Sequence, residues 1–319
     1  MEVSAISVFN SNLFNNIILN PYNEGRRKLK IITAYASPSF LHHVLYTLNE
    51  VEIELFIGMT KVQPITIWDH KEYLKMADDT KRLTVNYHNG NKPVHSKIVL
   101  WEQEGLFISE SAFVGSANFT RNGYSNYSET MASVNPSQVI NIFSNLKDYV
   151  PFDQPSLEKT MKFTYQSNSN NSNIDGSALG NLVKEKGYCH FNFPLTVNNN
   201  RRKIHEKSGL NWGQRPGREL NQAYIPVPKE VRKTDFFPDK KIEFTVITDD
   251  GESFICVVAQ DDNKALETCR DNSILGKYFR NRLGVPLGGF VSIEDLDRYG
   301  RHYVTIYKIN NETYFMDFS

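Results

Sequence analysis

The sequence predicts an α/β domain followed by a mainly β domain, and three observations lead to this. The chain has 319 residues, which exceeds the usual size of one hydrophobic core, so two domains are expected. In the first part, apolar β-branched runs alternate with a segment of helical spacing, which is typical of a mixed sheet flanked by helices. In the last part, short runs alternate with turn residues, which favours a β-barrel or sandwich.

The first elements form a strand-helix-strand unit. Residues 29–36 and 51–58 are apolar, rich in β-branched residues and bounded by turn residues, so both are expected to be strands. Residues 38–49 have apolar positions at helical spacing and begin at a Ser-Pro dipeptide, which predicts a helix. Further strands are expected over 83–87, 94–101 and 106–109.

A segment made almost wholly of Ser and Asn (QSNSNNSNIDG) begins at residue 166, and it has no apolar periodicity. We therefore place the first domain at 1–165, a linker at 166–180 and the second domain at 181–319. The second domain has one short expected helix, 273–283. Its strands are expected over 190–197, 242–248, 253–259, 290–293 and 303–307.

The charge pattern is balanced overall and basic in one region. The chain has 36 basic and 36 acidic residues, so its net charge does not indicate a nucleic-acid binder. Residues 201–233, however, hold nine Lys or Arg and three acidic residues. A basic surface for nucleic acid and an ordinary solvated face are both compatible with this composition.

Cysteine usage and hydropathy indicate the cellular compartment of the protein. The three cysteines are widely spaced and form no CxxC motif, so neither a disulfide framework nor a zinc site is indicated. The first residues lack the features of a signal peptide, and no segment approaches the length of a membrane span. We expect a soluble, cytoplasmic protein that does not associate with membranes.

His95 and Lys97 are the first residues that indicate chemistry. They lie in the expected strand 94–101, where residues two apart face the same side. Imidazole can act as a nucleophile or general acid near neutral pH, and an ammonium group can bind a phosphoryl oxygen. A His-x-Lys pair often occurs by chance, so it needs support from other parts of the sequence.

That support comes from GSANFT, the end of an expected strand that breaks into a turn and presents Ser116 and Asn118. Taken alone, this motif more often marks an ordinary turn. Together with the His-Lys pair it would surround one tetrahedral anion with an imidazole, a cation, a hydroxyl and an amide. Stabilising a pentavalent phosphorus centre needs such donors, so the combination predicts phosphoryl chemistry.

In this order and spacing, the motifs resemble those of the phospholipase D superfamily, whose signature is His-x-Lys, then Gly-Ser-x-Asn, then an acid. Glu129, within YSET, takes the place of that acid. In the family the acid hydrogen-bonds the histidine and fixes its tautomer, so the resemblance implies this role for Glu129. Lipid-hydrolysing members usually carry Asp five positions after the Lys, where this chain has Glu102.

The chain contains a single His-x-Lys motif, whereas lipases and tyrosyl-DNA phosphodiesterases of the superfamily contain two. By resemblance to its single-motif bacterial nucleases, one chain supplies half of a two-histidine site. The resemblance therefore implies a homodimer as the active form.

The second domain is rich in side chains that can read base edges, because Arg pairs with guanine and Asn or Gln with adenine. Flanking Pro and Gly residues indicate a projecting arm, although a polar loop with a structural Trp would look similar. The candidate DNA-binding residues are Asn211, Trp212, Gln214, Arg215, Arg218, Asn221, Gln222, Arg270, Asp271, Asn272 and Lys277. Like Lys277, Arg280 and Arg282 could contact phosphates or simply form a solvated helical face.

This half is similar to the C-terminal part of NgoFVII-type restriction endonucleases. The similarity is carried by LNWGQR, AYIPVP, NSILGKYFRNRLGV and YGRHYVTIYK. Members of this group, and the related BfiI, join a phospholipase-D-type nuclease to a DNA-binding pseudobarrel of the plant auxin-response-factor kind. That pseudobarrel grips the major groove with two arms. By analogy, the arms here would span about 211–222 and 262–272.

The resemblance implies a type II-like restriction endonuclease that binds double-stranded DNA and cleaves it through a phosphohistidine, with no metal and no other cofactor. Some members of the group work with a separate ATPase subunit, which could also be required here. One alternative is a non-specific or repair nuclease, or a phospholipase, that uses the same residues. Another is a DNA-binding regulator with an inactive nuclease fold, although the intact set of motifs argues against it.

Overall fold

The computed structural model describes residues 6–155, 157–165, 176–197 and 203–319. The chain divides into two compact units, Met1–Gln166 and Ser167–Ser319. Most of the expected linker, together with Arg201 and Arg202 of the basic region, lies outside the described residues. Residues 176–180, which were expected to belong to the linker, instead begin a helix, α6.

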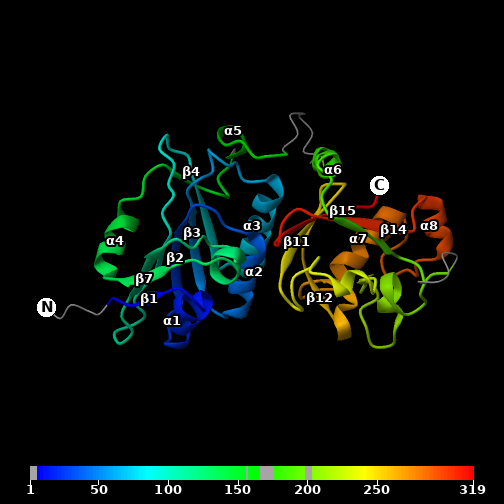
Figure 1. Ribbon diagram of the computed structural model, residues 1–319, viewed down its shortest axis with the longest axis horizontal. Helices are drawn as coiled ribbons and strands as arrows, with labels where there is room; N and C mark the ends of the chain where they lie inside the picture. The colour runs from blue at the N-terminus through cyan, green and yellow to red at the C-terminus, as the bar shows by residue number, and fades with distance from the viewer. Residues whose placement is uncertain (1–5, 156, 166–175, 198–202) are drawn as a thin grey trace. The chain divides into compact units, whose positions relative to one another are not determined.

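The first unit is built on an eight-stranded sheet with the order β1-β7-β6-β5-β2-β3-β4-β8. Helices α2 and α3 lie on one side of this sheet and α4 lies on the other (Figure 1). The strands are β1 (Val8–Phe9), β2 (Lys28–Thr33), β3 (Glu52–Ile57), β4 (Leu83–His88), β5 (Ile98–Trp101), β6 (Ser111–Gly115), β7 (Met131–Val134) and β8 (Tyr149–Pro151). The helices are η1 (Phe14–Leu19), α1 (Asn20–Asn23), α2 (Pro38–Thr47), α3 (Ile67–Thr80), η2 (Asn122–Asn126), α4 (Pro136–Ser144) and α5 (Leu157–Thr160).

The strand directions bring several chain segments to one edge of the sheet. Strands β2, β3 and β4 are parallel, and β5 runs antiparallel to β2. Strands β5, β6 and β7 then continue as antiparallel neighbours. The start of β5, the end of β6 and the start of β7 therefore lie at the same edge as the carboxyl ends of β2, β3 and β4.

Two expected strands of the first unit differ in the structure. The strand expected over 94–101 begins only at Ile98, because the Val94 amide bonds to the Gly58 carbonyl, 3.1 Å away, outside the β2–β5 ladder. The strand expected over 106–109 is wrong, since the chain turns there at Gly105, whose φ is +61°. A mixed sheet flanked by helices, as the sequence predicts, is confirmed.

The second unit is a nearly closed barrel formed by a seven-stranded sheet. Its order is β10-β13-β12-β11-β15-β14-β9, and the edge strands β9 and β10 contact each other. The strands are β9 (His190–Pro194), β10 (Ile225–Pro226), β11 (Phe244–Thr248), β12 (Ser253–Ala259), β13 (Ala265–Thr268), β14 (Tyr303–Lys308) and β15 (Thr313–Asp317). The helices are α6 (Gly176–Glu185), η3 (Gly209–Gln214), η4 (Val231–Lys233), η5 (Asp261–Asn263), α7 (Ser273–Leu283) and α8 (Ile293–Tyr299).

The core of the second unit lies between the barrel strands and α7. Phe193, Phe244 and Phe279 are among its fully buried side chains. The predicted helix 273–283 is confirmed as α7. The strand expected over 290–293 is wrong, because Ser292 caps α8 in a capping box with Asp295. A mainly β pseudobarrel is confirmed.

No helix in the described part of the chain has both the length and the apolar character needed to cross a membrane.

Candidate functional site

The predicted catalytic side chains come together at one edge of the first sheet. His95 and Lys97 directly precede β5, Ser116 follows β6, and Glu129 lies just before β7. The Gly115 amide bonds to the Lys97 carbonyl at 3.2 Å, and the Ser116 amide bonds to the Thr130 carbonyl at 2.9 Å. Backbone pairing thus aligns three segments that are far apart in the sequence.

His95 and Lys97 contact each other directly. Lys97 Nζ lies 2.9 Å from His95 Nδ1 and donates a hydrogen bond to the His95 carbonyl at 2.8 Å. The His95 side chain is exposed, whereas Lys97 is buried with 7% of its surface accessible. This burial lowers the pKa of Lys97, and the nearby Glu129 carboxylate opposes the shift. An accessible imidazole therefore lies beside a partly desolvated cation.

Ser116 links the Gly-Ser-x-Asn turn to the acidic residue. Its hydroxyl donates to the Glu129 carboxylate and accepts a hydrogen bond from the Thr130 amide at 3.0 Å. The resemblance implied a hydrogen bond between Glu129 and His95. In the part of the chain that the structure describes, Glu129 bonds to Ser116 instead, while the His95 ring contacts Lys97.

Asn118 is oriented by Thr33, the last residue of β2, and by Tyr35 just after it, which sequence reasoning missed. Its Oδ1 accepts from the Tyr35 amide at 3.3 Å and contacts the Thr33 hydroxyl at 3.4 Å. The same hydroxyl accepts from the Phe119 amide at 3.0 Å and donates to the Tyr35 carbonyl at 2.8 Å. With Oδ1 held in this way, the Nδ2 amide is the end of Asn118 that can donate to a ligand.

Thr33 and Tyr35 carry no motif, since a Thr at the end of an apolar strand is common. They reach Asn118 because the chain pairs Ala36 with Phe119, two residues that are far apart in the sequence. The Tyr35 ring meets the His95 ring edge-on, with centroids 6.4 Å apart. Tyr35 therefore contacts two of the predicted catalytic residues, one through its backbone and one through its ring.

Two glycines allow the close backbone approach that this edge needs. A Cβ atom on Gly115 would lie 2.0 Å from the Thr130 carbonyl oxygen, and one on Gly123 would lie 2.2 Å from the Asn118 carbonyl oxygen. Both contacts are with backbone, which cannot move aside easily. The glycine of the Gly-Ser-x-Asn motif is thus required for packing β6 against the segment before β7.

The arrangement combines an accessible imidazole with a cation, a hydroxyl and an amide. Such a donor set can bind the non-bridging oxygens of a phosphodiester and stabilise the charge that develops during displacement. Of the five predicted catalytic side chains, only Glu129 is a carboxylate, and it is engaged by Ser116. Magnesium favours several oxygen ligands in octahedral geometry, so these five residues do not fit a magnesium site.

In the second unit, several residues expected to read bases are structural. Asn211 is fully buried. Its side-chain Nδ2 donates to the Val291 carbonyl at 2.8 Å, and its Oδ1 accepts from the Val291 amide at 2.9 Å. Asn221 is also buried, and its Oδ1 accepts from the Gly288 amide at 2.6 Å. These bonds use the groups that a base would need, which corrects the expectation for both residues.

Asp271 is exposed and Asn272 is half-buried, and both have hydrogen-bond partners within the second unit. Asp271 accepts from the amide and the hydroxyl of Ser273 at 2.8 and 2.9 Å, at the start of α7. Asn272 donates weakly to Glu267 at 3.4 Å, and its carbonyl accepts from the Ala223 amide at 3.1 Å. The last bond connects the end of the second predicted arm to the residue that follows the first.

Other predicted DNA-contacting side chains remain on the surface. Arg215, Arg218, Arg270 and Lys277 are exposed, and Gln222 is half-buried. The Arg218 guanidinium lies 3.8 Å from the centre of the Trp212 ring and donates to Gln222 Oε1 at 2.9 Å. Trp212 is therefore a buried platform for Arg218, with only 8% of its surface accessible.

Gln214 lies at the base of this loop. Its Nε2 donates to the carbonyls of Leu220 and Gly288 at 3.4 and 3.1 Å. These bonds connect the two ends of the loop to the segment after α7. Gln214 is therefore half-buried, and its Nε2 donor is engaged by backbone.

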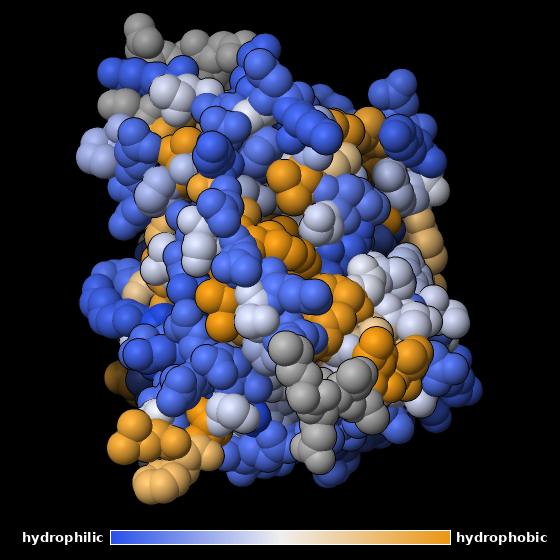
Figure 2. Space-filling model, turned by 90° about the vertical axis from the view of Figure 1, so that its left-hand side faces the viewer, coloured by the Kyte–Doolittle hydropathy of each residue, from blue (hydrophilic) through white to orange (hydrophobic). Residues whose placement is uncertain are grey.

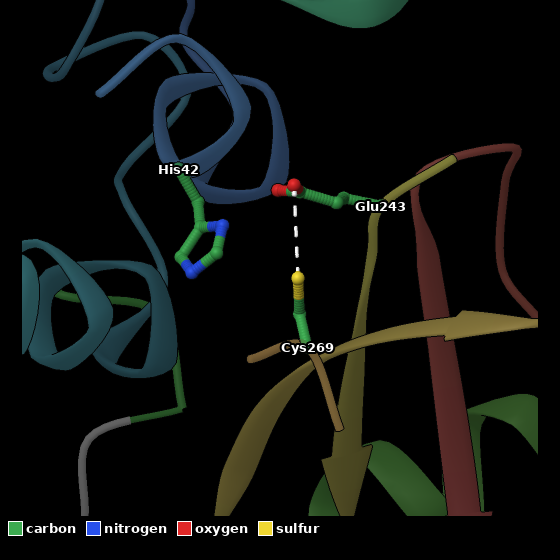
Figure 3. Close-up of side chains that lie close together, drawn as sticks. All are labelled: His42, Glu243 and Cys269. Atoms are coloured by element: carbon green, nitrogen blue, oxygen red, sulfur yellow. Dashed lines mark hydrogen bonds between the residues drawn. The ribbon is translucent and has the colours of Figure 1, made fainter. Parts of the chain in front are cut away.

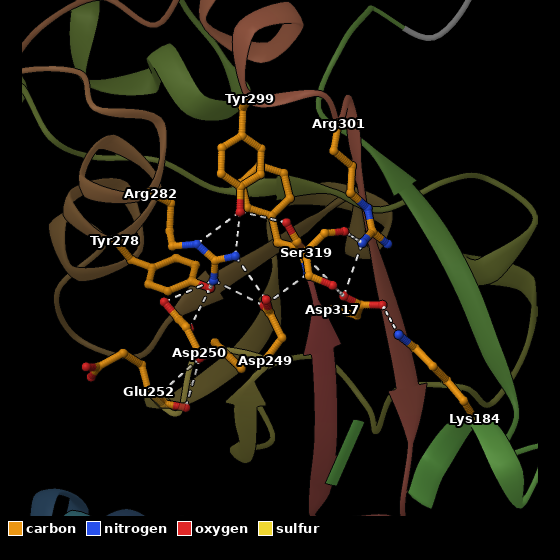
Figure 4. A network of polar contacts seen from close by, with 12 residues as sticks. Lys184, Asp249, Asp250, Glu252, Tyr278, Arg282, Tyr299, Arg301, Asp317 and Ser319 are labelled. Atoms are coloured by element: carbon orange, nitrogen blue, oxygen red, sulfur yellow. Dashed lines mark hydrogen bonds and ion pairs between the residues drawn. The ribbon is translucent and has the colours of Figure 1, made fainter. Parts of the chain in front are cut away.

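Two arginines of α7 that could have contacted phosphates are structural. Arg280 is fully buried and donates to backbone carbonyls, including that of Gly289 at 2.9 Å. Arg282 pairs with Asp249 and Asp250, both at 2.9 Å, within the network drawn in Figure 4. Of the three α7 cations, only Lys277 is exposed.

The cysteines form no disulfide, and one of them has a carboxylate partner. The Cys269 thiol donates to Glu243 at 3.7 Å (Figure 3). Burial, assisted by the Glu243 charge, raises the pKa of this thiol to about 12. Because the thiolate is the nucleophilic form, Cys269 is a poor candidate for covalent chemistry. Cys256 is buried, whereas Cys189 is exposed.

Comparison with known protein families matches both units. The model of the NgoFVII restriction endonuclease N-terminal PLD domain matches residues 11–162, where PLD stands for phospholipase D. The model of the NgoFVII C-terminal B3-like DNA-binding domain matches residues 183–310. A comparison with curated proteins found no match.

Among solved structures, NucT from Helicobacter pylori is 15% identical, with a TM-score of 0.32, and the match covers 44% of this chain and 91% of that one. Nuc from Salmonella typhimurium, a phospholipase D family member, is 13% identical, with a TM-score of 0.33 and coverages of 44% and 90%. A phosphatidylserine synthase from Haemophilus influenzae Rd KW20 is 16% identical, with a TM-score of 0.38 and coverages of 57% and 46%.

Proposed function

The chain belongs to the NgoFVII restriction endonuclease family, and from this premise we propose that it is a type II-like restriction endonuclease that cleaves DNA without a metal ion. It is a nuclease of the phospholipase D type with a B3-like DNA-binding domain. In this proposal residues 1–165 cut the DNA and residues 181–319 recognise a short sequence. The clustering of His95, Lys97, Ser116 and Glu129 at one sheet edge carries the proposal.

The reaction proceeds in two displacements. A His95 ring nitrogen attacks phosphorus and forms a phosphohistidine while the bond from phosphorus to the leaving deoxyribose oxygen breaks. His95 of a second copy gives its proton to that oxygen. Water then attacks the phosphohistidine, and the second imidazole takes the proton from this water. Both histidines return to their starting states, and the phosphodiester has been hydrolysed.

The other four residues bind and orient the reacting groups. The Lys97 ammonium, the Ser116 hydroxyl and the Asn118 Nδ2 amide hold the non-bridging oxygens as negative charge builds up. The Glu129 carboxylate fixes the Ser116 hydroxyl, and its charge opposes the lowering of the Lys97 pKa by burial. Glu129 thus supports binding of the phosphate through Ser116 and Lys97.

A homodimer completes the site, because one chain supplies a single His-x-Lys motif. The first unit has apolar side chains on its surface, which appear as orange patches in Figure 2. Val8 on the edge strand β1, Tyr127 next to Glu129, and Ile142 on α4 are 66%, 62% and 43% exposed. Burying such residues in a second copy would favour association near the half-site.

Metal independence is proposed from the chemistry of the donor set. The site offers an imidazole, an ammonium, a hydroxyl, an amide and one engaged carboxylate. The ammonium provides the positive charge that a divalent ion supplies in other nucleases. The family resemblance also allows a separate ATPase subunit, and DNA cleavage by the purified chain without ATP would exclude that requirement.

A plasmid cleavage assay with purified protein tests the proposal. We expect cutting at defined positions in the presence of EDTA, revealed by sequencing the ends. His95→Ala should abolish cutting while specific DNA binding is retained. Loss of cutting in EDTA would refute the metal-free mechanism, and cuts at random positions would identify a non-specific nuclease instead.

A further inference from the structure

Arg218 lies in an ordered loop of the second unit rather than on a free arm. The amide of Gly213 donates to the carbonyl of Gln222 at 2.7 Å, which closes the loop at its base. A Cβ atom on Gly213 would lie 2.4 Å from the carbonyl oxygens of Glu219 and Leu220, so the two sides of the loop pack tightly. Gly217, with φ of +79°, forms its tip.

Within this loop the Arg218 side chain is fixed on two sides. Its guanidinium lies 3.8 Å from the centre of the Trp212 ring, within the range of a cation–π contact. Trp212 is itself buried and packs edge-on against Tyr224, with centroids 5.4 Å apart. The second support is Gln222, whose Oε1 accepts from Arg218 at 2.9 Å.

This contact determines what the pair can offer to a ligand. Because Gln222 Oε1 is used by Arg218, the end of Gln222 that remains is the Nε2 donor. Every nitrogen of Arg218 is a donor as well. The exposed polar groups of the pair are therefore all hydrogen-bond donors, and they suit a ligand edge that carries only acceptors.

We propose that Arg218, supported by Trp212 and Gln222, reads a guanine through its major-groove edge. Guanine presents N7 and O6, which are both acceptors, whereas adenine and cytosine each present an amino donor there. This inference rests on the proposed function, because it requires that the second unit binds a specific DNA sequence.

The neighbouring Arg215 shows why stacking matters. Arg215 Nε donates to the Lys207 carbonyl at 2.6 Å, so this side chain is tied to backbone rather than supported by an aromatic ring. Arg218 is exposed, and its planar guanidinium is already held in place by Trp212 and Gln222. An ordered fork loses less entropy on binding, which favours recognition of one base over loose contact with phosphate.

The experiment first finds the sequence that the full-length protein selects from a randomised duplex library. Each guanine of that sequence is then replaced in turn by 7-deazaguanine, which lacks the N7 acceptor, and affinity is measured by fluorescence anisotropy. The same series is measured for Arg218→Lys, which keeps the charge but lacks the planar fork. Arg298→Lys, an exposed arginine of α8 paired with Asp295, is the matched control.

We expect one guanine at which 7-deazaguanine weakens wild-type binding on the order of tenfold, as for the loss of part of a bidentate contact. Arg218→Lys should lose this sensitivity at that position alone, and Arg298→Lys should keep it. If Arg218→Lys keeps the wild-type sensitivity at every guanine, or weakens binding equally for all sequences, the inference is wrong while specific binding stands. If the library yields no preferred sequence, the proposed function fails, and the inference fails with it.

Discussion

Lys97 Nζ lies 2.9 Å from Nδ1 and 3.1 Å from Nε2 of His95. Positive charge therefore lies directly beside the ring that is proposed to attack phosphorus. The same ammonium can bind the phosphoryl oxygen that the nucleophile attacks. The two residues therefore act as one unit.

Replacing Lys97 with Met should therefore lower kcat for DNA cleavage by about 100-fold or more, the usual effect of losing one donor to a developing negative charge. The affinity for specific DNA should change little, because the second unit supplies most of it. Single-turnover cleavage and anisotropy measure the two quantities. Lys92→Met removes an exposed charge from the same segment and should leave kcat unchanged. An equal loss in both variants would contradict a specific role for Lys97.

Glu129→Gln should shift the alkaline side of the pH profile of kcat. Burial lowers the pKa of Lys97, and the Glu129 carboxylate raises it again. Without that negative charge the pKa of Lys97 falls further, so the ammonium deprotonates at lower pH. Activity should then decline at lower pH than in the wild type. If the alkaline limb of the kcat–pH profile is the same in Glu129→Gln and the wild type, Glu129 does not act through Lys97.

Thr33→Val should reduce kcat about tenfold with little effect on DNA affinity. The variant leaves the Phe119 amide without its acceptor and releases Asn118 Oδ1, and an unsatisfied buried group costs about 1–3 kcal/mol. Thr33→Ser restores the hydroxyl and should recover most of the activity. Steady-state kinetics together with a denaturation curve separate loss of orientation from loss of folding.

Thr80→Val is the matched control for this prediction. The Thr80 hydroxyl also donates to a carbonyl, that of Met76 at 2.7 Å, and accepts a hydrogen bond from an amide, that of Arg82 at 3.3 Å. Thr80, however, is the last residue of α3 and precedes β4. Cleavage by Thr80→Val should match the wild type. If both valine variants lose activity to the same extent, the role assigned to Thr33 is wrong.

The sequence predicted the elements whose signals are local. Helix α7 and strand β12 were expected at their observed bounds, because apolar spacing and flanking turn residues define them. The short strand β7 was missed, since it owes its strand geometry to pairing with β6. Residues 106–109 look like a strand by composition, yet Leu106 and Phe107 are 88% and 97% exposed in a turn.

For the site, the sequence predicted the residue types and not their partners. The spacing of the motifs identified His95, Lys97, Ser116 and Asn118, and strand pairing brings their segments together. The contact of Glu129 with Ser116 and the support of Asn118 by Thr33 depend on long-range packing that no local pattern encodes. Asn211 has the composition of a base reader, but its neighbours in the fold make it a core residue.

His70 should make the first unit sensitive to acid. Its Nδ1 lies 3.1 Å from the Tyr87 hydroxyl, and burial, followed by the charge of Lys71, lowers its pKa to about 4. The pKa is lower in the folded state than the usual 6.5, so stability is complete above 6.5 and is lost as pH falls towards 4. The loss is about 3 kcal/mol at most. His70→Gln should show a flatter pH dependence of the free energy of unfolding, and an unchanged slope would contradict this assignment.

The central claim is that each active site uses His95 from two chains. The most direct test is a heterodimer of one wild-type and one His95→Ala subunit, isolated by two different affinity tags and assayed on plasmid DNA with EDTA. The account predicts that this heterodimer does not hydrolyse DNA, although it binds the target sequence as the wild type does. A heterodimer with half of the wild-type activity would show that each chain cleaves alone, and would contradict the account.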